Sequence, residues 1–452
     1  MMALPPPQLD PNPMQRIADA SPEKLSEYLE LFHPVDSKGR YLHYDEFQYR
    51  VPKGLDLHLA WSLVKLARKA QQKKLLSLGD PVQGCSFYLT PTIQKAISET
   101  DRHTTTPSLE WMSSQIGEQT YFECLLNDLI EDEAISSSQL EGAATTTKAA
   151  KEILKHQRKP RTPDERMIVG NFKMMKFAWE NRNKSLSNDI ILGLHQVGVE
   201  DIDNDKYRPG TFRASNDVEV VDERGNTVHS PPPFENLEKR LKSLCGWVNQ
   251  DHHDVESKDY LHPLVKAITL HFSIGFEHPF YDGNGRVARA LFYWYMFKHE
   301  FAAFRYIAIS VLLKAAPAKY GRSYIFSESD EMDLTYFIDC QCGIISRAIS
   351  EFKRSYTKAL SDIETFNAWL WSSGLYKKLS DKQRIVFQVA KNGVAPAFTV
   401  ANVQDNLGCS YNTAAKVLNG LVELKLFVKR KFGKTWVYAM RSKSKIQESW
   451  DS

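Results

Sequence analysis

The sequence lacks the features of a membrane or secreted protein. It contains no run of 18 apolar residues, and its first residues, MMALPPPQLDPNPMQR, do not have the basic-then-apolar order of a secretory signal. The six cysteines are scattered, and the closest pair, Cys340 and Cys342, has no second pair with which to form a zinc site. We therefore expect reduced thiols and a cytoplasmic protein.

A phosphate-binding P-loop is also missing. The letters GKT at 433–435 end such a motif, but Val428 stands where the motif requires Gly, and the surrounding residues have the pattern of a strand. We interpret Lys434 as a surface cation.

Charge is distributed unevenly along the 452 residues. The net charge is +3, but residues 374–452 hold 14 Lys and Arg against 5 Asp and Glu, so this segment carries +9 and the rest of the chain −6. Hydrophobic content of 42% and charged content of 25% are ordinary for a globular protein of two or three domains. The charge asymmetry predicts that only the C-terminal segment faces a polyanion.

The patterns along the chain predict a mainly α protein with three domains. Residues 1–108 form an N-terminal helical extension with a mobile Pro-rich leader, and residues 109–365 have the three- and four-residue apolar spacing of a helical domain. Within that domain, NDVEVVDERGNTVHSP at 216–231 alternates β-branched and polar residues around a turn, which predicts an inserted β-hairpin.

Residues 374–452 predict a winged helix-turn-helix domain, because three helical patterns are followed by two basic strands. Bound to DNA, such a domain would place its second helix in the major groove and its wing on the phosphates. The alternative is a winged helix used for protein contact or dimerisation. The candidate DNA contacts are Asn412, Thr413 and Lys416 on the helix, and Lys429, Arg430, Lys431 and Lys434 on the wing.

The stretch HPFYDGNGRVAR at 278–289 predicts an anion site with a base beside it. We expect one helix to end before His278 and another to run from Asn284 to Tyr295, so that the Gly-containing turn aims backbone amides outward at a helix N-terminus. Arg286 and Arg289 are three residues apart and can hold successive phosphates. Asp282 offers an oxygen ligand for a phosphate-bound magnesium, and His278 is suited to act as general base.

This stretch fits the signature of the Fic-domain family, H-[PF]-F-x-[DE]-G-N-G-R-x-x-R, at every fixed position, and the flanking residues are similar as well. The resemblance implies a Fic-type helical bundle that moves AMP from ATP, with Mg²⁺, onto a Ser, Thr or Tyr hydroxyl of a target protein. By motif position, His278 resembles the base, Phe280 the residue that fixes the loop, and Asp282 the magnesium ligand. The ATP-binding positions implied are Gly283, Asn284, Gly285, Arg286 for the β-phosphate and Arg289 for the γ-phosphate.

The predicted hairpin resembles the flap of the same family. An open strand edge can pair with an extended target segment and set its hydroxyl against the base. The implied docking edge is Asp217 to Val221, with Val218 and Val220 as the main contacts. The alternative is a hairpin that only covers the helical core.

A second segment, SSSQLEG at 136–142, resembles the inhibitory helix of Fic proteins, [ST]-x-x-x-E-[GN], at Ser137, Glu141 and Gly142. The resemblance implies that Glu141 pairs with Arg289 and so prevents the productive pose of ATP. It thus implies a protein adenylyltransferase of the self-inhibited class. Two alternatives stay open, a Fic enzyme that removes AMP from a modified protein and a DNA-binding transcriptional regulator that senses nucleotide. The oligomeric state, including a homodimer, is also open.

Overall fold

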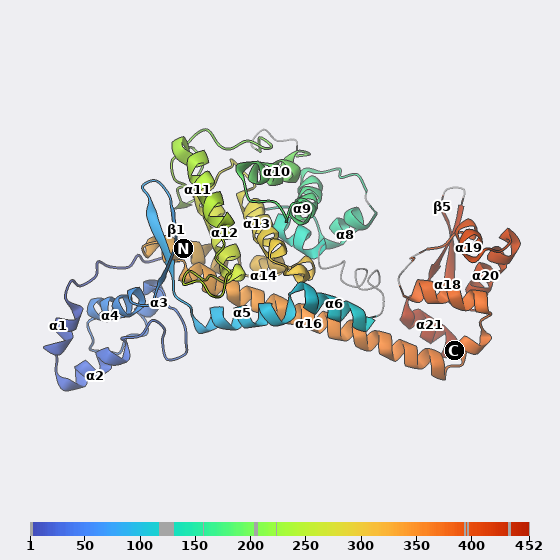
Figure 1. The fold of residues 1–452 in the computed structure, drawn as a ribbon, viewed down its shortest axis with the longest axis horizontal. Helices are drawn as coiled ribbons and strands as arrows, with labels where there is room; N and C mark the ends of the chain where they lie inside the picture. Colours follow the sequence, from blue (N-terminus) through green and yellow to red (C-terminus); the bar gives the residue numbers. More distant parts are fainter. Residues whose placement is uncertain are drawn as a thin grey trace. The chain divides into compact units, whose positions relative to one another are not determined.

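The computed structural model describes residues 3–116, 131–156, 158–202, 207–222, 224–392, 395, 397–432 and 435–451. These residues are mainly helical, and their strands form three two-stranded antiparallel sheets (Figure 1). Within this part of the chain, no helix combines the length and apolar character that crossing a bilayer would need. Contacts divide the chain into two compact units. Unit 1 comprises Met1–Ser108 and Leu129–Ser350, and unit 2 comprises Leu109–Asp128 and Glu351–Ser452.

Residues before the helical body fold as short helices and one strand pair. The leader, which its prolines predict to be mobile, makes specific contacts, since the amide of Leu4 donates to Asp45 at 3.0 Å and that of Asp10 to Ser62 at 2.8 Å. The strands β1 and β2 pair antiparallel. The elements are α1 (Pro13–Ala18), α2 (Pro22–Glu30), α3 (Tyr44–Phe47), α4 (Leu57–Lys69), β1 (Lys73–Leu78), β2 (Gln83–Phe87), α5 (Pro91–His103) and α6 (Thr106–Ile116).

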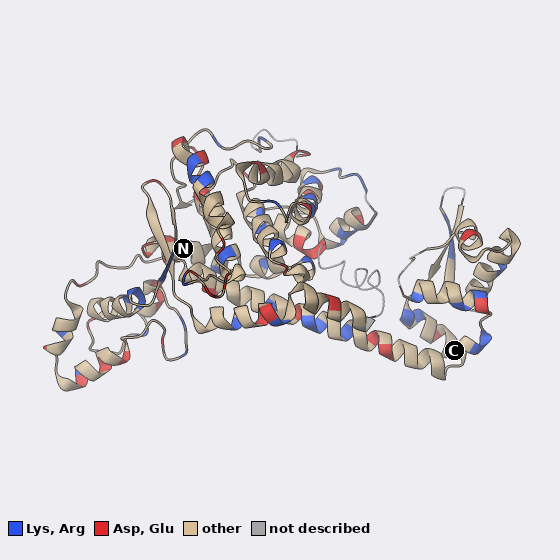
Figure 2. Cartoon of the chain, in the orientation of Figure 1, with Lys and Arg blue, Asp and Glu red and all other residues tan. Residues whose placement is uncertain are grey.

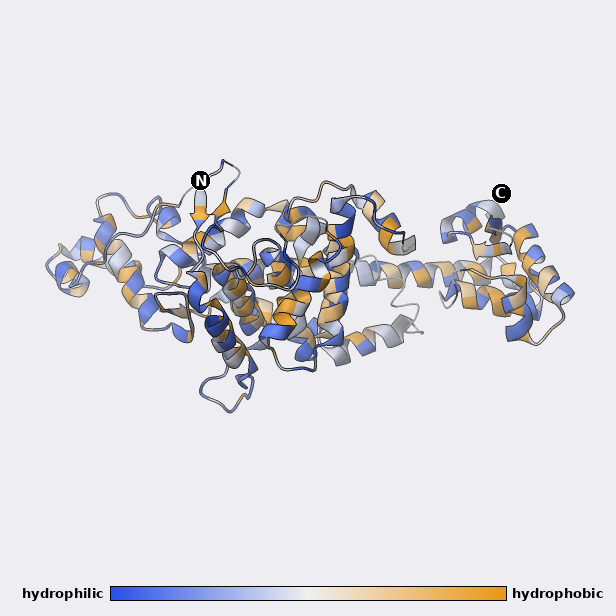
Figure 3. Cartoon of the chain, turned by 90° about the horizontal axis from the view of Figure 1, so that it is seen from above, coloured by the Kyte–Doolittle hydropathy of each residue, from blue (hydrophilic) through white to orange (hydrophobic). Residues whose placement is uncertain are grey.

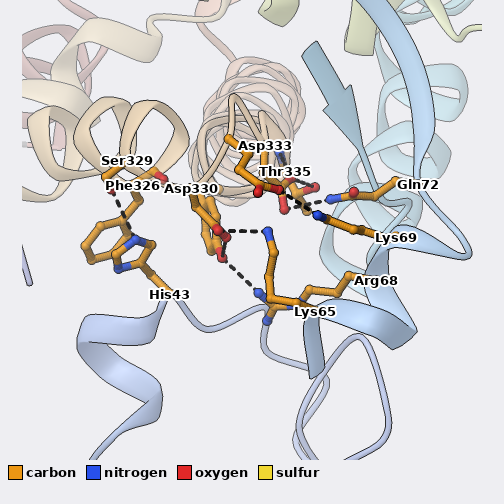
Figure 4. Close-up of polar contacts among 12 residues, drawn as sticks. His43, Lys65, Arg68, Lys69, Gln72, Phe326, Ser329, Asp330, Asp333 and Thr335 are labelled. Atoms are coloured by element: carbon orange, nitrogen blue, oxygen red, sulfur yellow. Dashed lines mark hydrogen bonds and ion pairs between the residues drawn. The ribbon is translucent and has the colours of Figure 1, made fainter. Parts of the chain in front are cut away.

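A buried polar network joins α4 to α15 (Pro317–Ser329) and to the start of α16 (Thr335–Ser372) (Figure 4). The Lys65 Nζ lies 2.7 Å from Asp330, and both side chains are almost fully buried. Arg68 donates to the hydroxyl of Tyr336 at 2.8 Å, and Tyr336 donates to the same Asp330 at 2.7 Å. A buried charge is tolerated only when its hydrogen bonds are satisfied, so this network specifies how the N-terminal helices meet α15.

The helical body of unit 1 is built around α12 (Pro263–Glu277) and α13 (Asn284–Lys298), which pack against each other. Nearly every residue of both helices is buried, which is typical of a helix that is apolar on all sides. The surrounding helices alternate hydrophobic and hydrophilic residues along their length (Figure 3). They comprise residues 131–140, α8 (Thr147–His156), α9 (Pro163–Glu180), α10 (Asn188–Val199), α11 (Leu237–Asn249) and α14 (Ile309–Ala315), with 3-10 turns η1 (Phe234–Asn236) and η2 (Ala302–Tyr306).

The hairpin expected at 216–231 is present but short. Its strands are β3 (Val220–Val221) and β4 (Thr227–His229), paired antiparallel with Val220 opposite His229. Asp217 and Val218, which we expected on the docking strand, precede β3 in irregular chain. Asp222 closes the turn that follows β3, because its side chain accepts from the amides of Arg224 and Asn226.

Unit 2 contains the long C-terminal part of α16 and a separate small core. Helices α18, α19 and α20 precede the antiparallel strands β5 and β6, in the order that the sequence predicts, while the identification as a winged helix stays a prediction. Ser410 caps α20 by accepting from the amide of Thr413. The elements are α17 (Leu375–Lys378), α18 (Asp381–Lys391), α19 (Val400–Leu407), α20 (Tyr411–Glu423), β5 (Phe427–Phe432), β6 (Thr435–Met440) and α21 (Lys443–Asp451).

Candidate active site

The expected anion site is the loop between α12 and α13. α12 ends at Glu277 and α13 begins at Asn284, as the sequence predicts, although α13 continues three residues beyond Tyr295 to Lys298. His278 takes the left-handed conformation, with φ 46° and ψ 60°, at the end of α12. Gly283 precedes α13 with φ 86°, which favours a residue without a side chain. The first amides of α13 have no acceptor within the helix and form its positive end.

Asn284 and Phe280 fix the shape of this loop from inside. The amide of Phe280 donates to the Asn284 Oδ1 at 2.8 Å, and the Asn284 Nδ2 donates back to the Phe280 carbonyl at 2.8 Å. Phe280 is fully buried. Asn284 therefore acts here through its side chain, as a brace for the backbone that would receive phosphate.

His195 of α10 supports the same loop and was missed by the sequence analysis. Its ring stacks on Phe280 at 3.8 Å between centroids, its Nε2 donates to the Asp282 carbonyl at 3.1 Å, and its Nδ1 accepts from the Gly210 amide at 3.2 Å. Burial lowers the pKa of His195 to about 4, so the ring is neutral. In the sequence it is a lone histidine on an apolar helix face, and no spacing signal marks it.

His278 is placed as a neutral base. Its Nδ1 donates to the Gly275 carbonyl at 3.2 Å, which leaves the lone pair on Nε2. Burial, assisted by the charge of His229, lowers the pKa of His278 to about 4. The ring is therefore unprotonated at neutral pH and able to accept a proton from a hydroxyl.

Arg286 is a buried cation with unused donors. It is 0% exposed, and its Nη1 donates to the carbonyl of Gly198 at 3.3 Å. Among the described residues, its Nε and Nη2 have no hydrogen-bond partner. Burial lowers the pKa of Arg286, although the side chain keeps its charge. Buried donors of this kind are satisfied when an anion binds beside them.

Arg289 is bound by the segment that carries Glu141. Its Nη2 lies 2.7 Å from the Glu141 Oε1, and its Nε donates to the Ser137 Oγ at 2.9 Å. Burial disfavours ionisation of Glu141, but the charge and hydrogen bond of Arg289 outweigh burial and lower the pKa of Glu141. In the same way the Glu141 charge outweighs burial and raises the pKa of Arg289. Both groups are therefore ionised and paired.

The helical residues 131–140 place Glu141 by several anchors. Glu133 accepts from the amide of Ser310 at 2.8 Å, at the start of α14, and the Asn171 Nδ2 of α9 donates to the Ala134 carbonyl at 3.0 Å. Gly142 follows in a left-handed turn with φ 98°. A Cβ on Gly285 would collide with the Glu141 Oε1, so the missing side chain at Gly285 leaves room for the carboxylate.

A cavity of about 220 Å³ brings these groups together. Val220 of the flap lines this cavity, whereas Asp217 and Val218, also described residues, are not part of its wall. The far wall is formed by α15. The cavity is thus lined by His278, by Arg289 with its partner Glu141, and by one of the three expected docking residues. Its main polar lining residues are Glu141, His278, Arg289 and Tyr320.

Asp282 is the only expected metal ligand. Its Oδ1 accepts from the Gly283 amide at 2.6 Å, which orients the carboxylate at the start of α13. Within the described residues, no group of three or more His, Cys, Asp or Glu side chains is arranged to hold a metal ion. One carboxylate suits Mg²⁺ that is held mainly by the phosphates of a nucleotide. The described residues therefore fit Mg²⁺ only when the phosphates of a bound nucleotide supply most of its ligands.

Arg213 links the flap to the loop and was also missed. Its Nε donates to the His278 carbonyl at 2.9 Å, and its Nη1 donates to the Ser215 carbonyl at 3.0 Å. Its Nη2 donates to the carbonyl of Pro232, on the other side of the hairpin. One buried guanidinium therefore holds both ends of the flap beside the base. The sequence YRPGTFR shows the arginine but not these partners.

In unit 2, the candidate DNA contacts lie on α20, which has one Lys, and on β5, which has two Lys and one Arg (Lys and Arg are blue in Figure 2). Asn412 and Lys416 are exposed and Thr413 is half-buried. Lys429, Arg430 and Lys431 are exposed on β5, and the Lys429 Nζ lies 4.8 Å from the ring centre of Trp436. Lys434 lies outside the described residues.

Comparison with known proteins finds a family match and similar proteins. Residues 185–296 match the Fic/DOC family. The chain is 26% identical over 182 residues to a protein adenylyltransferase Fic of Nematostella vectensis, which covers 38% of this chain and 36% of that protein. It is 25% identical over 122 residues to a uridine 5'-monophosphate transferase of Xanthomonas campestris pv. campestris (strain 8004), which covers 27% of this chain and 23% of that protein.

The crystal structure of a Fic family protein from Desulfovibrio desulfuricans G20 has a similar fold. Its TM-score is 0.50 at 18% identity, and the alignment covers 78% of this chain and 97% of that chain. The matches to the two named relatives span about a third or less of those proteins. Residues 185–296, the region similar to the Fic/DOC family, include α10, α11, α12, the loop after α12 and most of α13, with Arg286 and Arg289.

Proposed function

We propose that this chain is a nucleotidyltransferase that moves AMP from ATP to a Ser, Thr or Tyr hydroxyl of a target protein, releases pyrophosphate and is inhibited by its own Glu141. The observation that carries the proposal is the pairing of Glu141 with Arg289 at 2.7 Å in the cavity that contains His278. A buried ion pair that occupies a motif arginine beside a neutral base is expected of a blocked transferase site.

The residues support the following chemistry. The His278 Nε2 accepts the proton of the target hydroxyl while the hydroxyl oxygen attacks the α-phosphorus of ATP, and the bond from that phosphorus to the bridging oxygen of pyrophosphate breaks. The unused donors of Arg286 and the first amides of α13 bind the phosphate oxygens. Mg²⁺ bound with the nucleotide would neutralise charge on the phosphates beside Asp282. Catalysis then depends mainly on positioning and charge neutralisation.

Glu141 inhibits by holding the cation that the γ-phosphate would use. The Arg289 Nη2 is engaged by Glu141, and its Nε by Ser137. A γ-phosphate can bind Arg289 only after Glu141 leaves, because two anions cannot share one buried guanidinium without repulsion. The inhibition therefore ends when Glu141 moves or is removed.

The first test is the variant Glu141→Gly in the full chain. We expect increased labelling of the chain itself or of lysate proteins by ATP labelled in the α-phosphate, and we expect His278→Ala in that background to reduce it about 10²- to 10⁴-fold. Mass spectrometry of the product identifies the transferred group, with UTP supplied in a parallel reaction. Labelling that does not rise with Glu141→Gly contradicts inhibition by Glu141. Labelling that persists in Glu141→Gly/His278→Ala contradicts the role of His278.

Removal of AMP is the second candidate, because the Glu141 side chain is 24% exposed in the cavity and could hold a water there. The same variant distinguishes it. If the chain removes AMP through Glu141, then Glu141→Gly abolishes release of AMP from a modified protein, whereas transfer requires that Glu141→Gly increases modification.

For residues 374–452 we propose contact with a polyanion through α20 and β5, with duplex DNA as the first candidate. The exposed Lys416, Lys429, Arg430 and Lys431 support this proposal. Binding of the full chain to duplex DNA should weaken steeply with salt, and Lys429→Ala/Lys431→Ala should reduce the slope of log affinity against log salt by about 2. A slope near zero contradicts DNA contact and favours a protein partner, including a second copy of the chain.

A further inference from the structure

His229, the last residue of β4, lies between two hydrogen-bond acceptors of the cavity wall. Its Nε2 donates to the Phe276 carbonyl at 2.8 Å, and its Nδ1 lies 2.7 Å from the Glu328 Oε2 of α15. The His229 side chain is only 9% exposed and the Glu328 side chain 22%. The flap is therefore fastened to α12 and α15 by one histidine ring.

Both contacts are made only by the protonated ring. A carbonyl and a carboxylate accept hydrogen bonds, so each ring nitrogen of His229 must carry a hydrogen. Phe276 is also in the last turn of α12, where free carbonyls favour a cation. Burial disfavours the charge, but the hydrogen bond and charge of Glu328 outweigh it, and the pKa of His229 is raised above its usual value of 6.5.

His229 lies at the point where the flap meets the base. Its ring centre is 6.5 Å from that of His278, and it pairs across the hairpin with Val220, the docking residue that lines the cavity. The charge of His229 also disfavours protonation of His278. His229 thus affects both the position of the strand that carries Val220 and the pKa of His278.

We propose that His229 and Glu328 form an ionic latch that holds the flap strands on the cavity wall beside His278. The latch positions the target segment, so its effect on transfer rests on the function proposed above. The existence of the latch does not depend on that function. Neither residue belongs to the HPFYDGNGRVAR motif or to the inhibitory segment, and both are positioning residues.

The latch is expected to open at alkaline pH. A histidine whose pKa is raised in the folded state stabilises the fold below its unfolded pKa, and that stability is lost as pH rises through the folded pKa. The flap should therefore loosen as His229 loses its proton. The charged or titratable groups that act on it or lie beside it are Glu328 of α15, and Glu277 and His278 at the end of α12. Behind these, Arg240 of α11 pairs with Glu277, and Arg213 donates to the His278 carbonyl.

The test is Glu328→Gln in the full chain, compared with Glu331→Gln. The neutral amide that replaces the Glu328 carboxylate cannot balance the charge of a buried imidazolium. The control Glu331→Gln removes the same negative charge at a residue that is 62% exposed and pairs with the exposed Lys69. We expect hydrogen exchange of the amides between residues 217 and 230 to become about ten- to a hundredfold faster in Glu328→Gln near pH 6, and unchanged in Glu331→Gln. The difference from the unmodified chain should shrink at higher pH, where its latch also opens.

Histidine titration by NMR gives a second measurement that needs no enzyme activity. With histidine labelled at Cε1, we expect Glu328→Gln to lower the pKa of His229, because the carboxylate that raises it is gone. An unchanged pKa of His229, or unchanged exchange in the flap, overturns the latch. These two results stand whether or not the chain proves to transfer AMP.

If transfer is observed in Glu141→Gly, its pH profile tests the link to function. The latch predicts that the labelling rate falls at alkaline pH, which gives the pH profile an alkaline limb. This limb should move to lower pH in Glu141→Gly/Glu328→Gln and stay in place in Glu141→Gly/Glu331→Gln. A merely structural role would lower the rate at every pH alike and would leave the limb where it is, and that result contradicts the positioning role.

Discussion

His195 supports the phosphate-binding loop through three separate contacts, although it belongs to no motif. Phenylalanine in its place would preserve the stacking on Phe280 but remove the hydrogen bonds to the Asp282 carbonyl and from the Gly210 amide. We expect His195→Phe to lower the free energy of unfolding by about 1–3 kcal/mol, the cost of buried polar groups left unpaired. Urea denaturation followed by tryptophan fluorescence measures this loss.

The same substitution should weaken nucleotide binding more than it weakens the fold. Calorimetric titration of Mg-ATP into Glu141→Gly and Glu141→Gly/His195→Phe compares the two. His252→Phe is the control, because His252 is a partly exposed histidine of unit 1 whose ring contacts Lys266 and Trp247, outside the loop. Equal affinities for Mg-ATP in the two proteins would show that His195 does not position the loop for phosphate.

The motif residues could be predicted from sequence, while their supports could not. His278, Asp282, Arg286 and Arg289 are contiguous, and their helix-terminal setting follows from Pro279 and the glycines. His195, Arg213 and His229 each contact at least one partner that lies 65 to 99 residues away in the chain. Such contacts depend on how α10, the flap and α15 pack, which a local pattern does not encode.

The close approach of α9 and α10 determines where the acceptor of Arg286 lies. A Cβ on Gly170 of α9 would come within 3.0 Å of the Gly198 carbonyl, the group to which Arg286 donates. Gly170→Ala should therefore destabilise the protein by about 1–3 kcal/mol, although alanine is the better helix former. Thermal unfolding measures the change.

Gly246 provides a matched control for that prediction. It lies within α11, is exposed, and a Cβ there would meet no atom within 4 Å. Gly246→Ala should stabilise the protein by up to about 1 kcal/mol through helix propensity alone. If Gly170→Ala also stabilises, the helices do not pack as closely as described.

The elements differ in how well the sequence predicted them. Long periodic segments such as α12 and α13 were predicted to within three residues, because apolar spacing and helix-ending residues act locally. The flap was predicted too long, because alternation of β-branched residues continues through Asp217 to Glu219 where no partner strand exists. Strand length depends on the partner, which the alternation of a single segment does not show.

α15 connects two parts of unit 1 that the sequence treated as separate. Along its length Tyr320, Tyr324 and Glu328 line the cavity, while Ser329 at its end donates to the Ile325 carbonyl and contacts His43. The next residue, Asp330, binds Lys65 of α4, 265 positions earlier. The N-terminal residues are therefore part of the framework of the cavity wall, and this role could not be predicted without the packing.

The two units should respond differently to acid, because all 13 histidines precede residue 300 and none lies in unit 2. His43 and His195, each fully buried, have pKa values lowered to about 4 by burial, and that of His271 is lowered to about 3. A histidine with a lowered pKa takes up its proton first in the unfolded state, so stability falls as pH drops from 6.5 toward 4.

We expect each of these three histidines to cost unit 1 about 1 kcal/mol between pH 7 and pH 5.5. Three largely buried carboxyls with raised pKa values, Glu133, Asp333 and Asp339, act in the opposite direction and limit the loss. Hydrogen exchange of the full chain, corrected for the intrinsic pH dependence of exchange, should show lower protection in α10, α12 and α13 at pH 5.5 and unchanged protection in α18 and α20. Equal losses of protection in both units would mean that carboxylates, which both units contain, dominate the acid response. Constant protection of α12 between the two pH values would show that these histidines are not buried in the neutral form.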